Sequence, residues 1–188
     1  MADRAAMLAE LGQEIATCQR CALAATRTHA VPGEGPIHAQ IMFIGEGPGE
    51  QEDRSGRPFV GAAGQLLNQL LTRAGLQRSD IFITNIVKCR PPRNRDPQPA
   101  EATACRPYLD AQIALLTPRV ICLLGKPATH ALLAPGASMG KVHGVPQEVD
   151  GIIYVPLYHP AAALHQPSLE SVLVEDMERL KQFLTSAI

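Results

Sequence analysis

Four short apolar runs, separated by stretches with helical periodicity, restrict the fold of this chain more than any other feature of its sequence. The runs cover residues 40–45, 81–85, 119–125 and 152–158. Strands that alternate with helices favour right-handed βαβ units, which place parallel strands in one sheet and helices over both faces. The sequence therefore predicts an α/β fold with three layers, α/β/α, around a four-stranded parallel sheet. Pro156 in the fourth run indicates a sheet edge or a bulge.

Five helices are predicted around these strands. The first begins near Asp3, which can cap it, and the others cover residues 64–74, 100–116, 128–133 and 168–183. Residues 134–150 contain glycine and proline and are predicted to form a loop. Because 46% of the residues are hydrophobic and no long linker is present, residues 1–188 are expected to form a single domain with its own core.

Four cysteines have the spacing of a metal site. Cys18 and Cys21 form a CxxC pair, and Cys89 and Cys105 follow far along the chain. Four thiolates can hold one metal ion or one iron–sulfur cluster, and the spacing does not decide between zinc and a cluster. Disulfides are the alternative, but the N-terminus lacks the apolar core of a signal peptide, so a reducing cytosol is expected. Cys122 lies in an apolar run and is expected to be an inert core thiol.

The segment around the last two of the four cysteines is the most basic part of the chain. Lys88, Arg90, Arg93, Arg95 and Arg106 gather there, although the formal net charge of the chain is −1. Phosphate binding depends on a local basic surface rather than on the total charge. The segment is therefore expected to contact a nucleic acid. No apolar run approaches the length of a transmembrane helix, so no membrane partner is expected.

Polar residues follow the predicted strands. Glu46 and Gly47 follow the first strand, Asn85 ends the second, Gly125 and Lys126 end the third, and His159 follows the fourth. In open parallel sheets, ligands bind beyond the carboxyl ends of the strands, so these residues are expected to meet in one crevice. Each has an ordinary alternative, as a surface carboxylate, a turn residue or a loop histidine. Phe59, in a polar loop, is either a core residue or a plate on which a base stacks.

Taken together, the motifs resemble those of family 4 uracil-DNA glycosylases, the iron–sulfur type found in bacteria and archaea. The resemblance covers almost the whole chain. The motifs that carry it are Gly45-Glu-Gly-Pro-Gly-Glu-Gln-Glu-Asp53, Gly56-Arg-Pro-Phe-Val-Gly61, Thr84-Asn85, Lys88-Cys-Arg-Pro-Pro92, Cys105-Arg-Pro-Tyr108, Gly125 and His159-Pro-Ala-Ala162. The resemblance implies a uracil-DNA glycosylase-like fold and an enzyme that removes uracil from DNA by hydrolysing the N-glycosidic bond. It also implies that Cys18, Cys21, Cys89 and Cys105 hold a structural [4Fe–4S] cluster.

The resemblance assigns roles to the residues of the expected crevice. The residues that match the family's pocket motifs are Glu46, Gly47, Glu52, Phe59, Asn85 and His159. In the family, the first glutamate and the histidine are catalytic, the aromatic residue stacks on the flipped base, and the asparagine reads uracil. The second glutamate is associated with blocking the 5-methyl group of thymine.

The same resemblance implies how the chain meets DNA. Arg93 and Arg95 are candidate phosphate contacts, and Leu164 is the candidate apolar wedge inserted into the helix. A related subfamily traps itself covalently through a histidine, and Asn94 stands at that position here, so ordinary turnover without a covalent adduct is expected. The predicted substrate is uracil-containing DNA, single- or double-stranded, and the predicted protein is a monomer of the bacterial or archaeal cytoplasm, associated with the nucleoid. A DNA-binding module without activity and an electron-transfer protein are the alternatives.

Overall fold

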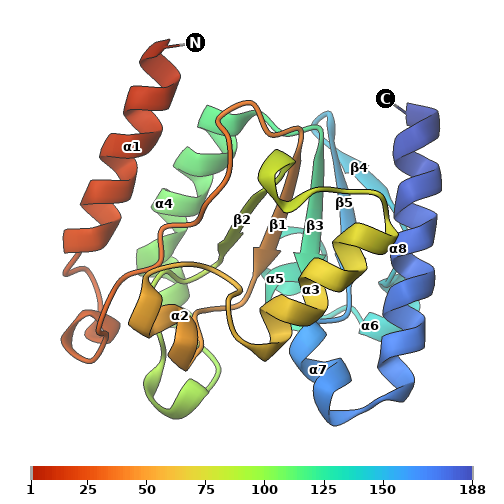
Figure 1. The fold of residues 1–188 in the computed structure, drawn as a ribbon. Helices are drawn as coiled ribbons and strands as arrows, with labels where there is room; N and C mark the ends of the chain where they lie inside the picture. The colour runs from red at the N-terminus through yellow and green to blue at the C-terminus, as the bar shows by residue number, and fades with distance from the viewer. Residues whose placement is uncertain (1, 188) are drawn as a thin grey trace.

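The computed structural model describes residues 2–187, which form a central five-stranded sheet (Figure 1). The strands are β1 (Ile41–Gly45), β2 (Phe82–Asn85), β3 (Val120–Leu124), β4 (Gln147–Val149) and β5 (Ile152–Leu157). Their order is β2-β1-β3-β5-β4, and all neighbours pair in parallel except β4, which pairs antiparallel with β5. The predicted α/β class and its four parallel strands are confirmed. The end residues of the predicted domain, Met1 and Ile188, lie outside the described residues.

The prediction of four strands was wrong by one, because β4 lies inside the stretch predicted to be a loop. β4 has only three residues and is largely exposed, so no apolar run marks it. The turn to β5 is Asp150-Gly151, with φ angles of 52° and 79°. That dipeptide with positive φ at both residues is typical of a two-residue β-hairpin, and it was the signal available in the sequence. Pro156 lies beyond the residues of β5 that pair with β4, which agrees with the predicted edge position.

Helices surround the sheet. They are α1 (Ala2–Thr17), α2 (Glu50–Ser55), α3 (Ala62–Arg73), α4 (Pro99–Leu116), α5 (Lys126–Leu132), α6 (Met139–Val142), α7 (Pro160–His165) and α8 (Ser168–Ala187), with 3-10 turns η1 (Ala22–Ala25), η2 (Arg78–Asp80) and η3 (Pro92–Asn94). The five predicted helices correspond to α1, α3, α4, α5 and α8, with ends shifted by at most four residues. The short helices α2, α6 and α7 were not predicted, because six residues or fewer carry too little periodicity to be recognised.

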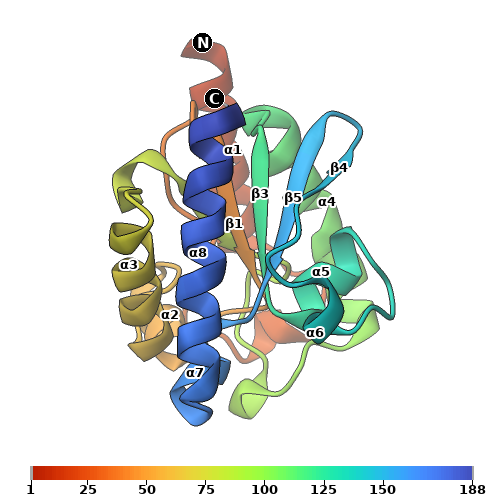
Figure 2. The same ribbon diagram turned by 90° about the vertical axis from the view of Figure 1, so that its right-hand side faces the viewer.

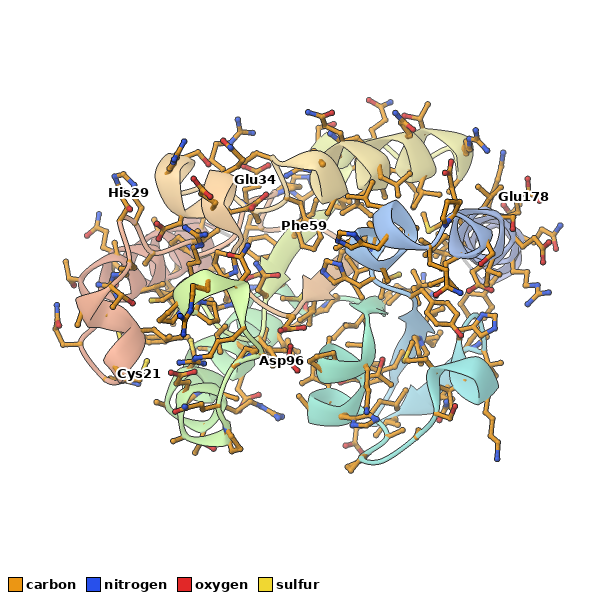
Figure 3. The ribbon with its side chains drawn as sticks, turned by 90° about the horizontal axis from the view of Figure 1, so that it is seen from below. Cys21, His29, Glu34, Phe59, Asp96 and Glu178 are labelled. Carbon is orange, nitrogen blue, oxygen red and sulfur yellow. The ribbon has the colours of Figure 1, made fainter. Side chains whose placement is uncertain are left out.

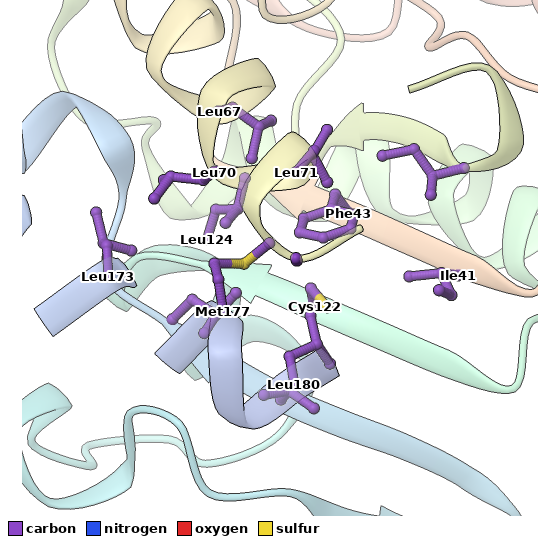
Figure 4. Packing of buried hydrophobic residues seen from close by; sticks show 14 of the residues in the cluster. Ile41, Phe43, Leu67, Leu70, Leu71, Cys122, Leu124, Leu173, Met177 and Leu180 are labelled. Atoms are coloured by element: carbon purple, nitrogen blue, oxygen red, sulfur yellow. The ribbon is translucent and has the colours of Figure 1, made fainter. Parts of the chain in front are cut away.

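The sheet separates two apolar cores, with α3 and α8 over one face and α4 and α5 over the other (Figure 2). Figure 4 shows the first core, in which leucines of α3 and α8 pack against the side chains of the sheet. Cys122 is fully buried there, and burial raises the pKa of its thiol. Its predicted place in the core is confirmed. Within residues 2–187, no helix is long and apolar enough to cross a membrane.

Candidate active site

A cavity of about 340 Å³ opens at the carboxyl ends of the parallel strands. Figure 3 views this side of the molecule and shows Phe59 near the middle of the face. All six predicted pocket residues line the cavity, whereas Gly125 and Lys126, which were expected to join them from the end of the third strand, are not among its lining residues. The lining residues are Glu46, Gly47, Pro48, Gly49, Glu52, Phe59, Ala63, Asn85, Pro91, Asn94, Arg95, His159 and Ala161. The volume lies in the range of pockets that enclose one small molecule or one base.

Asn85 brings an unpaired polar atom to the cavity. It is the last residue of β2, it is 1% exposed, and its Oδ1 atom is buried without a hydrogen-bond partner. Buried acceptors are nearly always paired, and an unpaired one costs about 1–3 kcal/mol. Gly45 allows this packing, because a Cβ atom there would collide with Asn85 Oδ1 and with the ring of Phe59. The amide is therefore positioned to accept a hydrogen bond from a ligand.

Two rings stand beside this amide. The rings of Phe59 and His159 are stacked with their centroids 5.6 Å apart and an interplanar angle of 28°. Phe59 belongs to the loop before α3, whereas His159 is the N-cap of α7, directly after β5. Proline at the first position of α7 suits a helix start, since that N–H would have no helical partner. The pocket thus has one aromatic wall from each of two distant segments.

The hydrogen bonds of His159 define its tautomer. The backbone N–H of Ala161 donates to His159 Nδ1 at 3.1 Å, so Nδ1 carries the lone pair. Burial lowers the pKa of His159 to about 4, which keeps the imidazole neutral at physiological pH. A neutral imidazole with an acceptor at Nδ1 carries its proton on Nε2. The free Nε2–H is therefore a donor available to a ligand.

Glu46 follows β1 and is held there by the sheet. Its carbonyl accepts a hydrogen bond from the N–H of Val87, which continues the β1–β2 ladder past the end of both strands. Burial, and secondarily the negative charge of Asp96, raise the pKa of Glu46 to about 7. A carboxyl group that titrates near neutral pH is suited to acid–base work. The influence of Asp96 on Glu46 was not predicted from the sequence, because the two residues lie 50 positions apart.

Glu52 lines the cavity, but its carboxylate also holds the backbone. Its Oε1 atom accepts hydrogen bonds from the N–H groups of Val60 and Gly61, each at 2.8 Å. Those two peptide groups directly follow Phe59. Glu52 therefore fixes the loop that carries the aromatic wall, a role that the sequence did not reveal.

Lys88 was expected to belong to the basic surface, but the structure buries it. Lys88 is 1% exposed, and burial lowers its pKa to about 7. Its Nζ atom donates to Thr84 Oγ1 at 2.6 Å, to the backbone carbonyl of Asn85 at 2.8 Å and to Gln112 Oε1 at 2.6 Å. The amine thus ties α4 to the end of β2, where the unpaired amide lies.

The four predicted ligand cysteines are grouped on the α1–α4 side of the molecule. Cys89 and Cys105 are buried in a small apolar cluster, and Cys18 and Cys21 pack against it (Figure 3 labels Cys21). All five cysteines of the chain have free thiols. Within the described residues, no three side chains of Cys, His, Asp or Glu are arranged to hold a single metal ion.

The buried surroundings of these sulfur atoms disfavour the thiolate form unless a positive charge lies close to the sulfur. Burial raises the pKa of the Cys105 thiol to about 11 and also raises that of Cys89. Arg27 Nη1 donates to Cys89 Sγ at 3.1 Å, and the N–H of Lys88 donates to Cys105 Sγ at 3.3 Å. Donors aimed at sulfur stabilise thiolates that ligate iron, so the donor set fits a sulfur-ligated cluster.

The predicted DNA contacts differ in their surroundings. Arg93 is exposed and makes no hydrogen bond or ion pair within residues 2–187. Arg95 lines the cavity, but its guanidinium forms two hydrogen bonds with the buried carboxylate of Glu101, at 2.7 and 2.8 Å. Leu164 on α7 is 48% exposed, close in sequence to the pocket residue Ala161. Arg93 and Leu164 are therefore accessible to a partner, whereas the charge of Arg95 is already neutralised.

The parallel sheet and the base-sized pocket at its carboxyl ends define a class of protein. Comparison with family models identifies that class. The model described as "Uracil DNA glycosylase superfamily" matches residues 32–182, which include every pocket residue. The chain is also similar to three proteins named type-4 uracil-DNA glycosylase. The relative from Saccharolobus solfataricus is 48% identical over 94% of this chain and 86% of its own. The relative from Sulfurisphaera tokodaii is 47% identical over 93% and 84%, and that from Thermotoga maritima 42% identical over 98% of both.

The chain therefore belongs to the type-4 uracil-DNA glycosylase family, within the uracil DNA glycosylase superfamily. The family predicted from the motifs is confirmed, and with it the prediction of an enzyme of the glycosylase class. The roles of the individual pocket residues, the cluster and the DNA contacts stay predictions.

Proposed function

We propose that this chain flips uracil out of DNA and hydrolyses its N-glycosidic bond, leaving an abasic site. The observation that carries the proposal is the unpaired Oδ1 atom of Asn85, buried at a base-sized pocket beside the rings of Phe59 and His159. Uracil presents a ring N–H donor next to a carbonyl acceptor, and a carboxamide can bind both. The enzyme is proposed to act as a monomer on uracil-containing DNA, single- or double-stranded, in the cytoplasm beside the nucleoid.

Contacts with the pocket residues offset part of the free-energy cost of flipping the base out of the duplex. Unstacking and unpairing a base costs a few kcal/mol, and stacking on an aromatic side chain recovers about 1–3 kcal/mol. Phe59 supplies this stack, and Asn85 accepts from N3–H while its amide donates to O4. Cytosine presents the opposite pattern of donor and acceptor at these two positions. The pocket therefore favours uracil over cytosine by the hydrogen bonds of one amide.

The chemistry requires charge stabilisation on both fragments. When the bond between the sugar C1′ and N1 breaks, its electron pair stays on uracil and places negative charge on O2. His159 Nε2–H and the N–H of Gly47 are the donors proposed to stabilise that charge. The sugar becomes positively charged, and ionised Glu46 offsets this charge and orients the water whose oxygen bonds to C1′. The water then loses one proton, and uracil ends by taking up one.

Release of uracil from a labelled oligonucleotide tests the proposal directly. Both strand forms are assayed, and release from a uracil oligonucleotide in at least one form, but not from the matched thymine oligonucleotide, is the expected result. A DNA-binding module would bind the uracil oligonucleotide without releasing a base. An electron-transfer protein would do neither. Both outcomes would reject the glycosylase.

We propose ordinary turnover without a lyase step or a covalent intermediate. Asn94 lines the cavity, and its Oδ1 atom accepts a hydrogen bond from Arg90 Nε at 2.7 Å. An amide is a weak nucleophile compared with an imidazole. After reaction, the DNA should migrate on a denaturing gel without attached protein and should keep an intact backbone at the abasic site. A protein–DNA band that survives denaturation would contradict this mechanism.

We propose that Cys18, Cys21, Cys89 and Cys105 hold a structural [4Fe–4S] cluster. In such a cluster each thiolate binds a different iron atom, so the four sulfur atoms do not converge on one point. Their grouping around one small apolar cluster, and the N–H donors of Arg27 and Lys88 directed at two of the sulfur atoms, support this assignment. When bound, the cluster would join the end of α1 to the loop after β2 and to α4. The elements are far apart in sequence, and the cluster would hold the basic segment between them.

Asn85→Asp should lower uracil excision about 10- to 100-fold. An ionised carboxylate accepts from N3–H but cannot donate to O4, so one of the two hydrogen bonds becomes repulsive. Single-turnover rates on uracil and cytosine oligonucleotides measure the change, and a thermal melt of the variant verifies that it is folded. Unchanged excision of uracil by the folded variant would remove Asn85 from the pocket chemistry.

The rate of excision should rise as pH increases through about 7. The raised pKa means that Glu46 is protonated and neutral below pH 7, where it cannot offset the positive sugar. Asp96→Asn removes a negative neighbour, so the pKa of Glu46 should fall and the inflection should move to lower pH. The measurement is single-turnover rate against pH, with Asp80→Asn as a control outside the pocket. An inflection that stays in place in Asp96→Asn would contradict the proposed coupling.

Arg93→Ala should flatten the salt dependence of DNA binding by about one unit of slope in log Kd against log salt. The reason is that Arg93 is exposed and unpaired, so its full charge is available to one phosphate. Arg73→Ala is the matched control, since α3 carries Arg73 about 15 Å from Ala63 at the pocket. Equal slopes for the wild type and Arg93→Ala would mean that the basic loop faces away from DNA.

A further inference from the structure

Phe59 has a backbone conformation that side chains rarely adopt. Its φ angle is 49°, in the left-handed region, where a bulky residue is an outlier. The residue is 5% exposed and its ring faces His159 in the pocket. Such a conformation persists only where the surroundings over-determine it. The contacts of this turn are therefore expected to control where the ring stands.

Two side chains of opposite charge hold the peptide groups on either side of Phe59. Before and at the turn, Arg78 donates to the carbonyl of Pro58 through Nη2 at 2.6 Å and to that of Phe59 through Nη1 at 3.1 Å. After the turn, the N–H groups of Val60 and Gly61 donate to the carboxylate of Glu52. Four consecutive residues are thus fixed by one cation and one anion.

Arg78 is itself held in place. Its Nε and Nη2 atoms donate to Glu34 Oε1 at 3.0 and 2.8 Å, and its Nη1 atom donates to Asn68 Oδ1 at 3.0 Å. Figure 3 labels Glu34 and Phe59 on this side of the molecule. Only 22% of the Arg78 side chain is exposed, so the planar guanidinium makes its hydrogen bonds almost entirely within the protein.

Helix α3 also packs tightly against this turn. Gly64 lies in the first turn of α3, and a Cβ atom there would overlap the carbonyl group of Phe59. Since the backbone of Phe59 cannot move toward α3, its carbonyl is confined between the helix and the guanidinium of Arg78.

We propose that Arg78 is a positioning residue that fixes the plane of the Phe59 ring and so sets the affinity of the pocket for a flipped uracil. The inference rests on the proposed function, in which Phe59 stacks on the base. Arg78 is not among the residues that line the cavity and acts through the carbonyl groups of Pro58 and Phe59. Arg57 is its natural comparison, because it also pairs with Glu34 but reaches neither carbonyl.

The test measures two affinities for each variant, with oligonucleotides that carry either uncleavable 2′-fluoro-deoxyuridine or deoxythymidine at one site. The affinity for the uridine oligonucleotide divided by that for the thymidine oligonucleotide measures recognition of the base by the pocket. A general loss of DNA binding lowers both affinities and leaves this ratio unchanged. Arg78→Ala and Arg78→Lys should each lower the ratio about 3- to 10-fold, because lysine keeps the charge but loses the fork. Phe59→Ala should lower it about 5- to 150-fold, as for one lost base–aromatic stack. Arg57→Ala should leave the ratio unchanged.

Double variants separate the inference from the function on which it rests. In the Phe59→Ala background, Arg78→Lys should cause no further loss, because the ring through which Arg78 acts is gone. The same loss in both backgrounds, or an unchanged ratio in folded Arg78→Lys, would overturn the positioning role. If Phe59→Ala alone leaves the ratio intact, the proposed stacking by Phe59 fails instead. Thermal melts verify folding, and Arg78→Lys decides the question if Arg78→Ala does not fold.

Discussion

Replacement of His159 by alanine should lower the rate of uracil excision about 10²- to 10³-fold, the usual cost of removing one donor that stabilises a developing oxyanion. The donor is the Nε2–H of a neutral imidazole, since the N–H of Ala161 occupies Nδ1. KM should change little, because the charge on O2 develops only as the bond breaks. Single-turnover kinetics on a uracil oligonucleotide measure the effect.

His38→Ala is the control for this variant, because His38 is exposed and precedes β1, at the amino ends of the parallel strands and away from the pocket. It should retain the wild-type rate. With a pKa of about 4, His159 stays neutral above pH 5, so an inflection near pH 7 belongs to Glu46 and should persist in His159→Ala. A folded His159→Ala that keeps the wild-type rate would assign the stabilisation of O2 to another group.

Cys105→Ala should remove the cluster and lower the melting temperature by about 10 °C, which for a chain of this size corresponds to about 3–5 kcal/mol. The loss is large because binding of a structural metal centre contributes directly to the free energy of folding. A brown colour and broad absorbance near about 400 nm report the cluster in the wild type. Both should disappear together with iron and acid-labile sulfide in the variant.

Cys122→Ala is the matched control. Cys122 is fully buried in the core under α3 and α8, so its replacement leaves a small cavity and costs about 1 kcal/mol. Iron content and visible absorbance should be unchanged. Loss of iron from Cys122→Ala, with iron retained in Cys105→Ala, would mean that the ligands are misassigned. A colourless native protein that contains zinc would overturn the cluster itself.

The arrangement of the pocket was predictable because it follows from topology. Glu46, Asn85 and His159 each come at the end of a parallel strand, and parallel strands end at the same edge of a sheet. Apolar runs of five to seven residues identify such strands without any knowledge of their neighbours. The antiparallel β4 escaped prediction since its three exposed residues pair only along an edge, where burial imposes no pattern.

The residues that support the pocket could not be predicted in the same way. Arg78 precedes β2 in a polar segment, and no local pattern indicates that it reaches back to the carbonyl of Phe59. The positive φ of Phe59 was equally hidden, because sequence rules expect glycine or asparagine in that region. Lys88 was assigned to the basic surface, whereas the structure buries its amine among oxygen atoms of β2 and α4. Such contacts depend on the complete fold.

The unpaired Oδ1 atom of Asn85, at the end of β2, limits how stable this enzyme can become against unfolding. An apolar side chain of similar size at position 85 would relieve a deficit of about 1–3 kcal/mol, but under the proposed function the variant would lose the amide that distinguishes uracil from cytosine. Adaptation to heat must therefore proceed through other parts of the chain, while this weak point is preserved. In the proposed complex, uracil supplies the missing donor, so the protein is expected to be hardest to unfold when the base is bound.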